Sequence, residues 1–433
     1  MNIEQLYQTY LQHPVISTDT RKIIPGSIFF ALKGDKFDAN TFAQQALDAG
    51  AAYAVIDNGD YNVSQKCILV DDVLSCLQNL ARYHRKQLNI PFVGLTGSNG
   101  KTTTKELIRA VLSQHFNTYA TYGNLNNHIG VPLTILAIDQ TVEMAVIEMG
   151  ANHQKEIELL CSIAQPTHGL ITNVGKAHLE GFGGAEGVKK GKGELYDYLK
   201  TSKGVIFVNQ DSKVLTDMVA ERALTDVQYY GSDIGNNISG ELLENSPYLK
   251  LRWKIKNEAY HTVQSQLTGA YNMDNLLAAI CIGHYFKLSP DEINTGLSGY
   301  QPHNNRSQIV KTASNTLICD YYNANPSSMF VAIENIGKLP AGRKVVILGD
   351  MFELGEESAV EHESVIQKAM QTAIDERIFI GAEFYKQSEL VNATFYRSVE
   401  DAIGAFKSRP VKNATILIKG SRGMALERLV DLF

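Results

Sequence analysis

Short apolar runs recur along the chain, and several of them end in glycine or polar residues. Examples are "IPFVGLTG" (90–97), "EMAVIEMGA" (143–151) and "HGLITNVG" (168–175). Runs of this length and composition are typical of strands buried on both faces of a parallel sheet. Because open α/β sheets bind ligands at the carboxyl ends of such strands, we expect the polar residues that follow these runs to form a site.

The same pattern divides the chain into three α/β regions. Residues 1–84 contain the run "GSIFFALKG", a helical segment closed by Gly50, and the run "AYAVID", which predict a small α/β domain. Residues 85–301 predict a central domain with a mostly parallel sheet. Residues 302–433 follow the Pro/Asn-rich break "GYQPHNNR" and alternate strand-like with helical segments, which predicts a Rossmann-like domain.

The stretch "GLTGSNGKTTTKEL", Gly94 to Leu107, indicates a phosphate-binding loop, and therefore a central domain of the P-loop ATPase type. Strand, glycine turn, lysine, threonine and helix follow in the order that points backbone N–H groups at anionic oxygens. Lys101 would neutralise the β- and γ-phosphates, and the Thr102 hydroxyl could bind Mg²⁺. The common loop has glycine where this chain has Leu95, and the alternative is a turn that caps an ordinary helix. The expected nucleotide contacts are Thr96, Gly97, Ser98, Asn99, Gly100, Lys101, Thr102 and Thr103.

Polar residues elsewhere are candidates that the pattern alone leaves open. Glu148 ends a buried run, where a carboxylate serves as a Mg²⁺ ligand or simply faces solvent. His178 follows another run, and the lysines of "GVKKGKGEL" (187–195) form either a solvated helix face or part of a site. The Asn-rich segment "YGNLNNHIGVP" (122–132) is either a turn-rich loop or a loop that lines a polar substrate.

Composition narrows the class of protein. With 44% hydrophobic and 20% charged residues, the chain is typical of a globular protein, and its net charge of −6 argues against a nucleic-acid partner. The five cysteines form no C-x-x-C pair, which favours a reducing compartment. The N-terminus is too polar for a secretory signal, and no apolar run approaches the ~20 residues of a membrane helix. We therefore expect a cytoplasmic protein with no membrane insertion.

Together these segments resemble the Mur ligases, the ATP-dependent amide-forming enzymes of peptidoglycan precursor synthesis. The family's shortened loop, T-G-x-N-G-K-[ST], matches "TGSNGKT" (96–102) and accounts for Leu95. "IEMGANHQKEI", "AHLEGFG", "YNANPSSM", "GDMFELG" and "KGSRGM" resemble the members that join D-alanyl-D-alanine to UDP-N-acetylmuramoyl-tripeptide. "STDTRKIIPGSIFFALKGDKFDAN" is similar to the start of their UDP-binding domain, so the resemblance runs from Ser17 to about Met424.

The resemblance implies roles for particular residues. It makes Lys192 a carbamylated lysine that holds a second Mg²⁺ together with His178. Thr102 and Glu148 would hold the first Mg²⁺. Two Mg²⁺ ions and ATP are therefore expected. It assigns catalysis to Lys101, Glu148, His178 and Lys192. It places Asn272, Asn275, Arg306 and Asp320 at the nucleotide. The substrate contacts that we expect are Thr20, Arg21, Asn124, Asn126, Asn127, Asn323 and Asn325.

The resemblance also implies a mechanism and a substrate for each of the three domains. The three domains would bind the UDP substrate (1–84), ATP (85–301) and the dipeptide (302–433), and a carboxylate would be activated as an acyl-phosphate before the amine attacks. Both meso-diaminopimelate and L-lysine fit as the third stem residue. We expect a monomer. The rivals are another amide ligase of the superfamily, such as folylpolyglutamate synthetase or the enzyme that adds the third stem residue, and a P-loop switch or motor.

Two positions depart from the family pattern. The N-terminal motif usually reads D-G-H, where this chain has Asp38, Ala39 and Asn40. The Gly-Arg pair at the end of the central domain is Asn305-Arg306. The first departure removes a histidine, and the second changes the residue that precedes the retained arginine.

Overall fold

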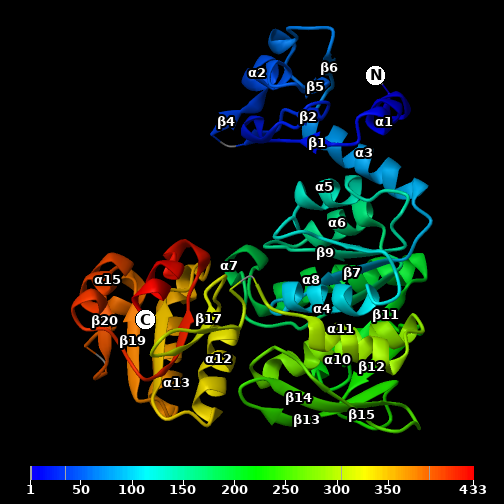
Figure 1. Cartoon of the computed structure of the whole chain (residues 1–433). Helices are drawn as coiled ribbons and strands as arrows, with labels where there is room; N and C mark the ends of the chain where they lie inside the picture. Colours follow the sequence, from blue (N-terminus) through cyan, green and yellow to red (C-terminus); the bar gives the residue numbers. More distant parts are fainter. Residues whose placement is uncertain (1, 35, 304, 390) are drawn as a thin grey trace.

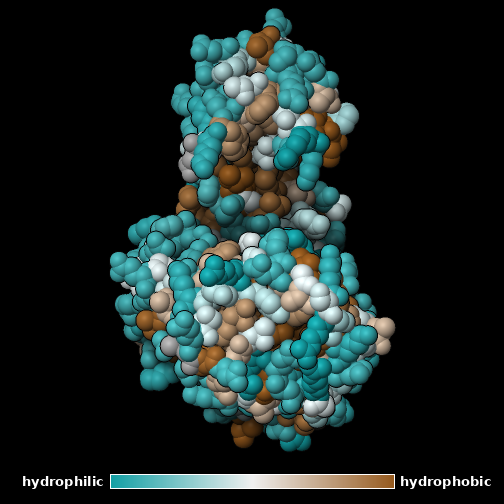
Figure 2. Space-filling model, turned by 90° about the vertical axis from the view of Figure 1, so that its left-hand side faces the viewer, coloured by the Kyte–Doolittle hydropathy of each residue, from teal (hydrophilic) through white to brown (hydrophobic). Residues whose placement is uncertain are grey.

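The computed structural model describes residues 2–34, 36–303, 305–389 and 391–433. Its elements form three α/β domains, each built around its own main sheet (Figure 1). The N-terminal domain lies at the top of the view, the central domain beneath it, and the C-terminal domain beside the central one. Figure 2 shows that the surface narrows below the N-terminal domain and that hydrophobic side chains gather at this waist. The predicted α/β fold with three domains is confirmed.

The N-terminal domain is built on a four-stranded parallel sheet of order β1-β2-β5-β6. Its strands are short, with β2 and most of β5 buried, and a small antiparallel hairpin of β3 and β4 lies beside them. The strands are β1 (Ile16–Ser17), β2 (Ile28–Phe30), β3 (Lys33–Gly34), β4 (Phe37–Asp38), β5 (Tyr53–Ile56) and β6 (Cys67–Leu69); the helices are α1 (Ile3–Gln12), α2 (Ala43–Asp48) and α3 (Val73–Gln87).

The central domain contains a nine-stranded sheet of order β15-β14-β13-β12-β11-β10-β7-β9-β8. Its strands are β7 (Phe92–Thr96), β8 (Thr118–Ala120), β9 (Met144–Glu148), β10 (His168–Ile171), β11 (Val205–Asn209), β12 (Val227–Gly231), β13 (Ile238–Asn245), β14 (Leu249–Ile255) and β15 (His261–Gln264). Its helices are α4 (Lys101–Leu112), α5 (Gly130–Leu136), α6 (Glu156–Ala164), α7 (Leu179–Phe182), α8 (Ala185–Ser202), α9 (Lys213–Glu221), α10 (Met273–Tyr285) and α11 (Pro290–Gly299). The sheet is mostly parallel, as predicted.

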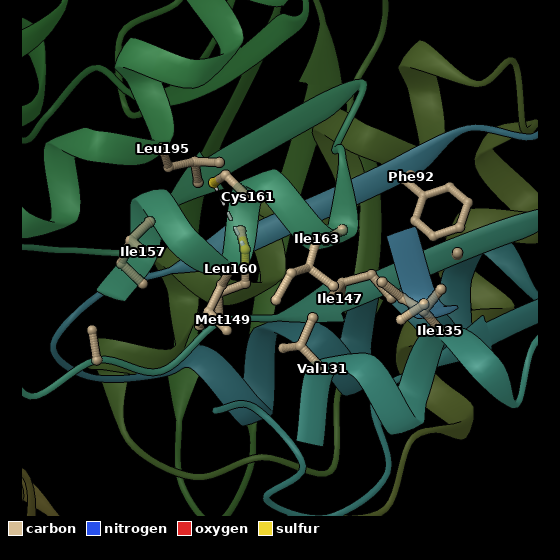
Figure 3. Packing of buried hydrophobic residues seen from close by; sticks show 14 of the residues in the cluster. Phe92, Val131, Ile135, Ile147, Met149, Ile157, Leu160, Cys161, Ile163 and Leu195 are labelled. Carbon is tan, nitrogen blue, oxygen red and sulfur yellow. Dashed lines mark hydrogen bonds between the residues drawn. The ribbon is translucent and has the colours of Figure 1, made fainter. Parts of the chain in front are cut away.

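Helices cover both faces of this sheet. On one face α4, α10 and α11 bury residues such as Leu107, Ile108 and Leu276. On the other face α5, α6 and α8 pack around Phe92, Ile147 and Cys161 (Figure 3). Because the strands are buried on both sides, they read as continuous apolar runs in the sequence, and this is why β7, β9 and β10 were predictable.

The edge formed by β13, β14 and β15 is antiparallel and was not predicted. Along β14, buried and partly exposed positions alternate, with Trp253 fully buried and its indole N–H bonded to Asn294 at 2.9 Å. An antiparallel sheet that meets water on one face carries this alternation in place of an apolar run. The edge lies away from the expected site, so the predicted site residues do not depend on these three strands.

The C-terminal domain has a six-stranded sheet of order β16-β17-β21-β18-β19-β20, in which only the β16–β17 pair is antiparallel. The strands are β16 (Gln308–Lys311), β17 (Thr316–Asp320), β18 (Lys344–Gly349), β19 (Glu376–Ile380), β20 (Thr394–Tyr396) and β21 (Thr415–Lys419); the helices are α12 (Pro326–Lys338), α13 (Ser358–Gln371), α14 (Ala382–Tyr385) and α15 (Val399–Ser408). The final segment "MALERLVDLF" forms 3₁₀ turns, η6 (Arg422–Met424) and η7 (Leu426–Leu432). Within the described ranges, no helix has the length and apolar character needed to cross a membrane.

Helix α3 joins the first two domains without a break. It contacts α1 and β2 of the N-terminal domain and α5 and α6 of the central domain. Near its C-terminus the buried Arg85 guanidinium donates to the carbonyls of Leu88, Ala164 and Gln165, each at 2.9 Å. It also lies over the ring of Phe92, with 3.7 Å from Cζ to the ring centre. One side chain therefore fixes the end of α3 to the end of α6.

The variant Arg85→Met tests this junction. It keeps the aliphatic stem but leaves three carbonyls without their donor, which we expect to cost about 2–4 kcal/mol. The melting temperature should fall by about 2–4 °C, as measured by calorimetry. Arg82→Met is the matched control, because Arg82 lies on the same helix, is only partly buried and makes one bond to α6. Equal melting temperatures for the two variants would contradict this account.

Candidate active site

A cavity of about 850 Å³ lies where the carboxyl ends of the central strands face the C-terminal domain. The loops after β7, β9 and β10 form one wall, and residues after β17 and at the end of β21 form the opposite wall. Polar side chains predominate in this lining. The two parallel sheets therefore direct their ligand-binding ends at one shared space.

The loop between β7 and α4 is held closely against the end of β10. Gly97 has φ +146°, and a Cβ atom there would lie 2.0 Å from Thr172 Oγ1, so the position admits only glycine. The Asn99 N–H donates to Asn173 Oδ1 at 2.9 Å, and Thr172 Oγ1 donates to the Asn99 carbonyl at 2.6 Å. Ser98 Oγ donates to the Gly175 carbonyl at 3.1 Å. These bonds fix the loop before any ligand arrives.

The N-terminus of α4 faces the cavity and has no side-chain cap. Uncapped N–H groups of a first helical turn form a ready anion site. Lys101 folds back over the loop and donates to the Gly97 carbonyl at 2.6 Å. Burial lowers the pKa of Lys101 to about 8, an effect that Glu148 opposes and Arg306 adds to. The arrangement suits a phosphate chain, whose charge would hold Lys101 protonated.

Glu148 ends β9 almost fully buried, and its two carboxylate oxygens differ in their surroundings. Oε1 accepts from Thr102 Oγ1 at 3.2 Å and from Asn126 Nδ2 at 2.8 Å. Oε2 has no hydrogen-bond partner among the described residues. A buried carboxylate oxygen without a donor is costly unless a cation or a ligand satisfies it. Glu148 with the Thr102 hydroxyl therefore fits the oxygen ligands that Mg²⁺ prefers.

The Asn-rich segment before α5 divides into structural and cavity-facing residues. Asn127 Oδ1 accepts from the N–H groups of Ile129 and Gly130 at 3.1 and 2.8 Å, which starts α5. Asn126 holds Glu148, as described above. Asn124, Asn126 and Asn127 all line the cavity, and their contact with substrate stays a prediction.

His178, just before α7, lines the cavity, whereas Lys192 of α8 is buried and is not among the lining residues. Lys192 is 1% exposed, and its ammonium donates to the Ala151 carbonyl at 3.1 Å and lies 4.8 Å from the Phe182 ring centre. Burial, followed by the nearby Lys101, lowers the pKa of Lys192 well below its usual value. His178 Nδ1 is bonded to Glu353 of the C-terminal domain, which leaves Nε2 for another partner. Histidine ligands of metals commonly bond a carboxylate through the other ring nitrogen.

These side chains fit a second metal ion only if Lys192 is modified. Within the described ranges, no three His, Cys, Asp or Glu side chains cluster as a metal site. A free ammonium repels a cation, whereas a carbamate on Nζ would supply anionic oxygens. The donor set that the resemblance implies is therefore a histidine nitrogen and carbamate oxygens, in place of a cluster of acidic side chains.

Two predicted nucleotide residues also support the phosphate loop. Asn275 Oδ1 accepts from Thr104 Oγ1 at 2.9 Å, and a Cβ on Gly100 would lie 2.8 Å from it. Asn275 Nδ2 donates to Asn272 Oδ1 at 2.8 Å, and Asn272 Nδ2 donates to the Thr268 carbonyl at 2.8 Å. Both asparagines line the cavity. Their mutual bonds orient α10 against the loop, and contact with adenine stays a prediction.

Arg306 and Asp320 come from the C-terminal side of the cavity, as expected. The Arg306 guanidinium lies over the Tyr322 ring, 4.0 Å from its centre, and Arg306 Nε is buried without a partner among the described residues. Asp320 pairs with Lys419 at 2.7 Å. The residue before Arg306 is Asn305 with φ +55°, a left-handed conformation that asparagine tolerates better than most residues. The departure from Gly-Arg is therefore compatible with the turn.

Hydrogen bonds cross the cavity between the two domains. Asn325 Nδ2 donates to Asn99 Oδ1 of the phosphate loop at 2.8 Å. The Lys176 N–H donates to Ser327 Oγ at 3.0 Å, and its ammonium pairs with Glu361 at 2.6 Å. Asn325 thus contacts the phosphate loop directly, whereas Asn323 lines the same cavity.

Two predicted substrate residues lie apart from this cavity. Thr20 and Arg21 form a 3₁₀ turn, η1 (Thr20–Lys22), in the N-terminal domain, and Arg21 pairs with Asp19. Nearby, Asn40 is fully buried and donates to Asp38 and Asp57 at 2.6 and 2.8 Å. Asn40 therefore has a complete structural role in place of the family's histidine.

Several side chains that line the cavity were not among the predicted site residues, including Tyr271, Tyr322 and Lys419. Lys419 stands at the end of β21, and the strand-end rule applied to Glu148 also identifies it. Tyr271 precedes α10, and its hydroxyl lies 2.5 Å from Ser307 Oγ. Nothing in the local pattern distinguishes either tyrosine from a core aromatic residue.

Comparisons with known proteins agree with this geometry. Residues 95–283 match the family description "Mur ligase middle domain", and residues 305–422 match "Mur ligase, glutamate ligase domain". A Bacillus subtilis UDP-N-acetylmuramoyl-tripeptide–D-alanyl-D-alanine ligase is 36% identical over 426 residues, covering 96% of this chain and 92% of the relative. A crystal structure of MurF from Acinetobacter baumannii superposes with a TM-score of 0.89 at 29% identity, covering 100% and 98% of the two chains. MurF from Thermotoga maritima, solved with ADP, gives 0.85 at 26% identity, covering 98% and 97%.

The Glu148→Gln variant tests the first metal position by nucleotide binding. It retains Oε1 for the bonds from Thr102 and Asn126 but removes the negative charge. We expect Mg²⁺ to strengthen ADP binding to the unaltered chain by at least about tenfold, and this gain to be largely lost in the variant. Calorimetric titration with ADP, in Mg²⁺ and in EDTA, measures both values. Lys101→Ala is the comparison variant, since it should weaken binding in both conditions. An unchanged Mg²⁺ effect in Glu148→Gln would rule out this ligand.

Proposed function

This chain belongs to the Mur ligase family, and we propose that it joins D-alanyl-D-alanine to UDP-N-acetylmuramoyl-tripeptide at the expense of ATP. The full-length relatives that carry this activity support the assignment. The observation that carries it in the structure is the direct bond from Asn325 to Asn99 at 2.8 Å, because it brings "YNANPSSM", a segment expected to contact substrate, to the phosphate loop. The product is the UDP-muramoyl-pentapeptide precursor of peptidoglycan.

The reaction has two steps. An oxygen of the tripeptide's terminal carboxylate attacks the γ-phosphorus of ATP, ADP leaves, and an acyl-phosphate forms. The amine nitrogen of D-alanyl-D-alanine then attacks the acyl carbon. The tetrahedral intermediate collapses with loss of phosphate and of one proton from nitrogen, which leaves an amide. Both steps depend chiefly on positioning and on charge stabilisation, so no nucleophile from the protein is needed.

The residues around the cavity suit these steps. Lys101 and the N-terminus of α4 would hold the phosphate oxygens where negative charge develops, and Arg306 would reach the same oxygens from the C-terminal domain. Thr102 with Glu148, and His178 with carbamylated Lys192, would hold Mg²⁺, which supplies charge compensation for the crowded phosphoryl oxygens. The interdomain bonds would exclude water from the acyl-phosphate.

The three domains divide the substrates among them. We propose that residues 1–84, with Thr20 and Arg21, bind the UDP end, that residues 85–301 bind ATP, and that residues 302–433 bind the dipeptide. Asn124, Asn126 and Asn127 would contact the tripeptide stem near its terminal carboxylate. All of these groups come from one chain, so we expect a monomer, acting in the cytoplasm where ATP and UDP-sugars are available.

A ligation assay with mass spectrometry tests the function. The chain is incubated with ATP, Mg²⁺, D-alanyl-D-alanine and a UDP-muramoyl-tripeptide that ends in either meso-diaminopimelate or L-lysine. We expect a pentapeptide product with at least one tripeptide, together with one phosphate released per amide formed. Phosphate release that needs neither peptide but rises with nucleic acid or a protein partner would indicate a P-loop switch or motor instead.

Replacement of Lys192 tests the carbamate. We expect Lys192→Ala to lose ligation by about 10³-fold or more, because the second metal loses its anionic ligands. Added short-chain carboxylic acids should restore part of the rate by occupying the vacated space. The control is Lys189→Ala, three residues earlier on α8, whose ammonium pairs with Glu221 at the surface. Full activity of Lys192→Ala without added acid would eliminate the proposed role.

A further inference from the structure

Lys105 is one of the largest side chains that the structure buries completely, with 0% exposure. It lies on α4, one helical turn after Lys101, but it is not among the residues that line the large cavity. Lysine is almost never fully buried unless it is paired. Lys105 therefore touches no ligand in that cavity, and the reaction described above makes no use of it.

The Lys105 ammonium makes two contacts. It donates to the Thr121 carbonyl at 2.5 Å and pairs with the Glu106 carboxylate at 2.8 Å. Replacing a buried ion pair by apolar side chains is often neutral or even stabilising, so the pair by itself does not explain why a lysine stands here. The bond to the Thr121 carbonyl is the contact that reaches beyond α4.

Thr121 connects this contact to Glu148. It is almost fully buried and follows β8, a three-residue strand at the edge of the central sheet. Its N–H donates to the Val146 carbonyl at 3.0 Å, and its Oγ1 accepts from the Glu148 N–H at 3.0 Å. Thr121 is therefore held between α4 and the end of β9.

Two connections thus run from α4 to Glu148. Thr102 Oγ1 donates to Glu148 Oε1 at 3.2 Å, which is long for a hydroxyl donor, so this bond alone holds the carboxylate loosely. Three residues later on the same helix, Lys105 reaches the backbone of Glu148 through Thr121. The second connection limits how far the end of β9 can move from the helix.

Thr121 also comes directly before the Asn-rich segment at 122–132. Within this segment Asn126 donates to Glu148 Oε1 at 2.8 Å. The bond from Lys105 therefore fixes the point at which the segment leaves the sheet, and the segment in turn bonds the same carboxylate that Thr102 reaches.

We propose that Lys105 is a positioning residue that keeps the phosphate-binding helix in register with Glu148. The inference rests on the proposed function, since it concerns the Mg²⁺ position assigned there to Thr102 and Glu148. Without the ammonium, the Thr121 carbonyl loses its donor and the end of β9 shifts relative to Thr102. Mg²⁺ demands near-ideal octahedral geometry, so such a shift weakens its binding. Lys101 keeps its place, because its bond to the Gly97 carbonyl lies within the loop itself.

The test compares ADP binding in Mg²⁺ and in EDTA, by calorimetric titration, for the unaltered chain and for Lys105→Met. Methionine keeps an unbranched apolar side chain but has no donor. Loss of a group that orients a metal ligand typically costs 10- to 100-fold in metal affinity. We expect the gain from Mg²⁺, at least about tenfold in the unaltered chain, to fall below about threefold in the variant. Affinity for ADP in EDTA should change by less than about threefold, because the loop and Lys101 are unaltered.

Arg85→Met is the matched control. It also removes a buried cation that donates to backbone carbonyls, but at the junction of α3 with α6 rather than beside the phosphate loop. Both variants should melt at a lower temperature than the unaltered chain, and only Lys105→Met should lose the gain from Mg²⁺. An equal loss in the two variants would mean general destabilisation and would overturn the inference.

Thr121→Val tests the same connection if Lys105→Met does not fold. Valine has nearly the shape of threonine and leaves the carbonyl for Lys105, but it removes the hydroxyl that accepts from the Glu148 N–H. We expect this variant to lose most of the gain from Mg²⁺ as well. Retention of the full gain by Thr121→Val, or by a folded Lys105→Met, would show that the connection does not position Glu148.

Ligation of the unaltered chain is measured separately, which distinguishes this inference from the function on which it rests. If the unaltered chain forms no amide with either tripeptide, the proposed function fails, while the calorimetric comparison still decides the role of Lys105. If the unaltered chain forms the amide but ADP binding gains nothing from Mg²⁺, the function stands and the inference is wrong.

Discussion

The close approach of the loop after β7 to the end of β10 is the constraint on which the rest of the site depends. Gly97 leaves no space for a Cβ beside Thr172, and the bonds from Asn99 to Asn173 and from Ser98 to Gly175 hold the loop on the sheet. The start of α4 follows from this position, and so does the distance from Thr102 to Glu148. The same loop then supplies Asn99 as the contact for the C-terminal domain. A small displacement here would misalign phosphate, metal and acceptor groups together.

Sequence reasoning identified the strands whose ends carry the site, because strands buried on both faces leave continuous apolar runs. Glu148 and the loop at 96–103 could be placed from that pattern alone. His178 and Lys192 could not, since α7 and α8 place them through packing against α6 and Phe182, and only resemblance distinguished Lys192 from its neighbours. The antiparallel strands β13 to β15 were not predicted, because their alternation of buried and exposed residues resembles the sequence of a polar loop.

The structure also shows that several residues predicted to contact ligands have a structural role. Asn127 starts α5, Asn275 supports the phosphate loop and Asn40 joins Asp38 to Asp57. An asparagine in a functional loop is therefore weak evidence for ligand contact when taken alone, because its amide often forms hydrogen bonds with the backbone of that loop. Unpaired groups are more informative. Glu148 Oε2 and Arg306 Nε lack hydrogen-bond partners among the described residues, and both residues line the large cavity. Unlike the asparagines, such groups become apparent only when the side chains are placed in space.

The continuity of α3 fixes the spacing between the first two domains. This helix has 15 residues and contacts both the N-terminal and the central domain, so no flexible linker separates their sheets. At about 1.5 Å per residue, it spans roughly 22 Å as a rigid spacer. Before the C-terminal domain, in contrast, the described residues 300–303 and 305–307 between α11 and β16 form no helix or strand. With the substrate assignment proposed above, the first two domains would act as a ruler of fixed length. A stem peptide anchored at its nucleotide end would place its terminal carboxylate according to the number of residues it contains.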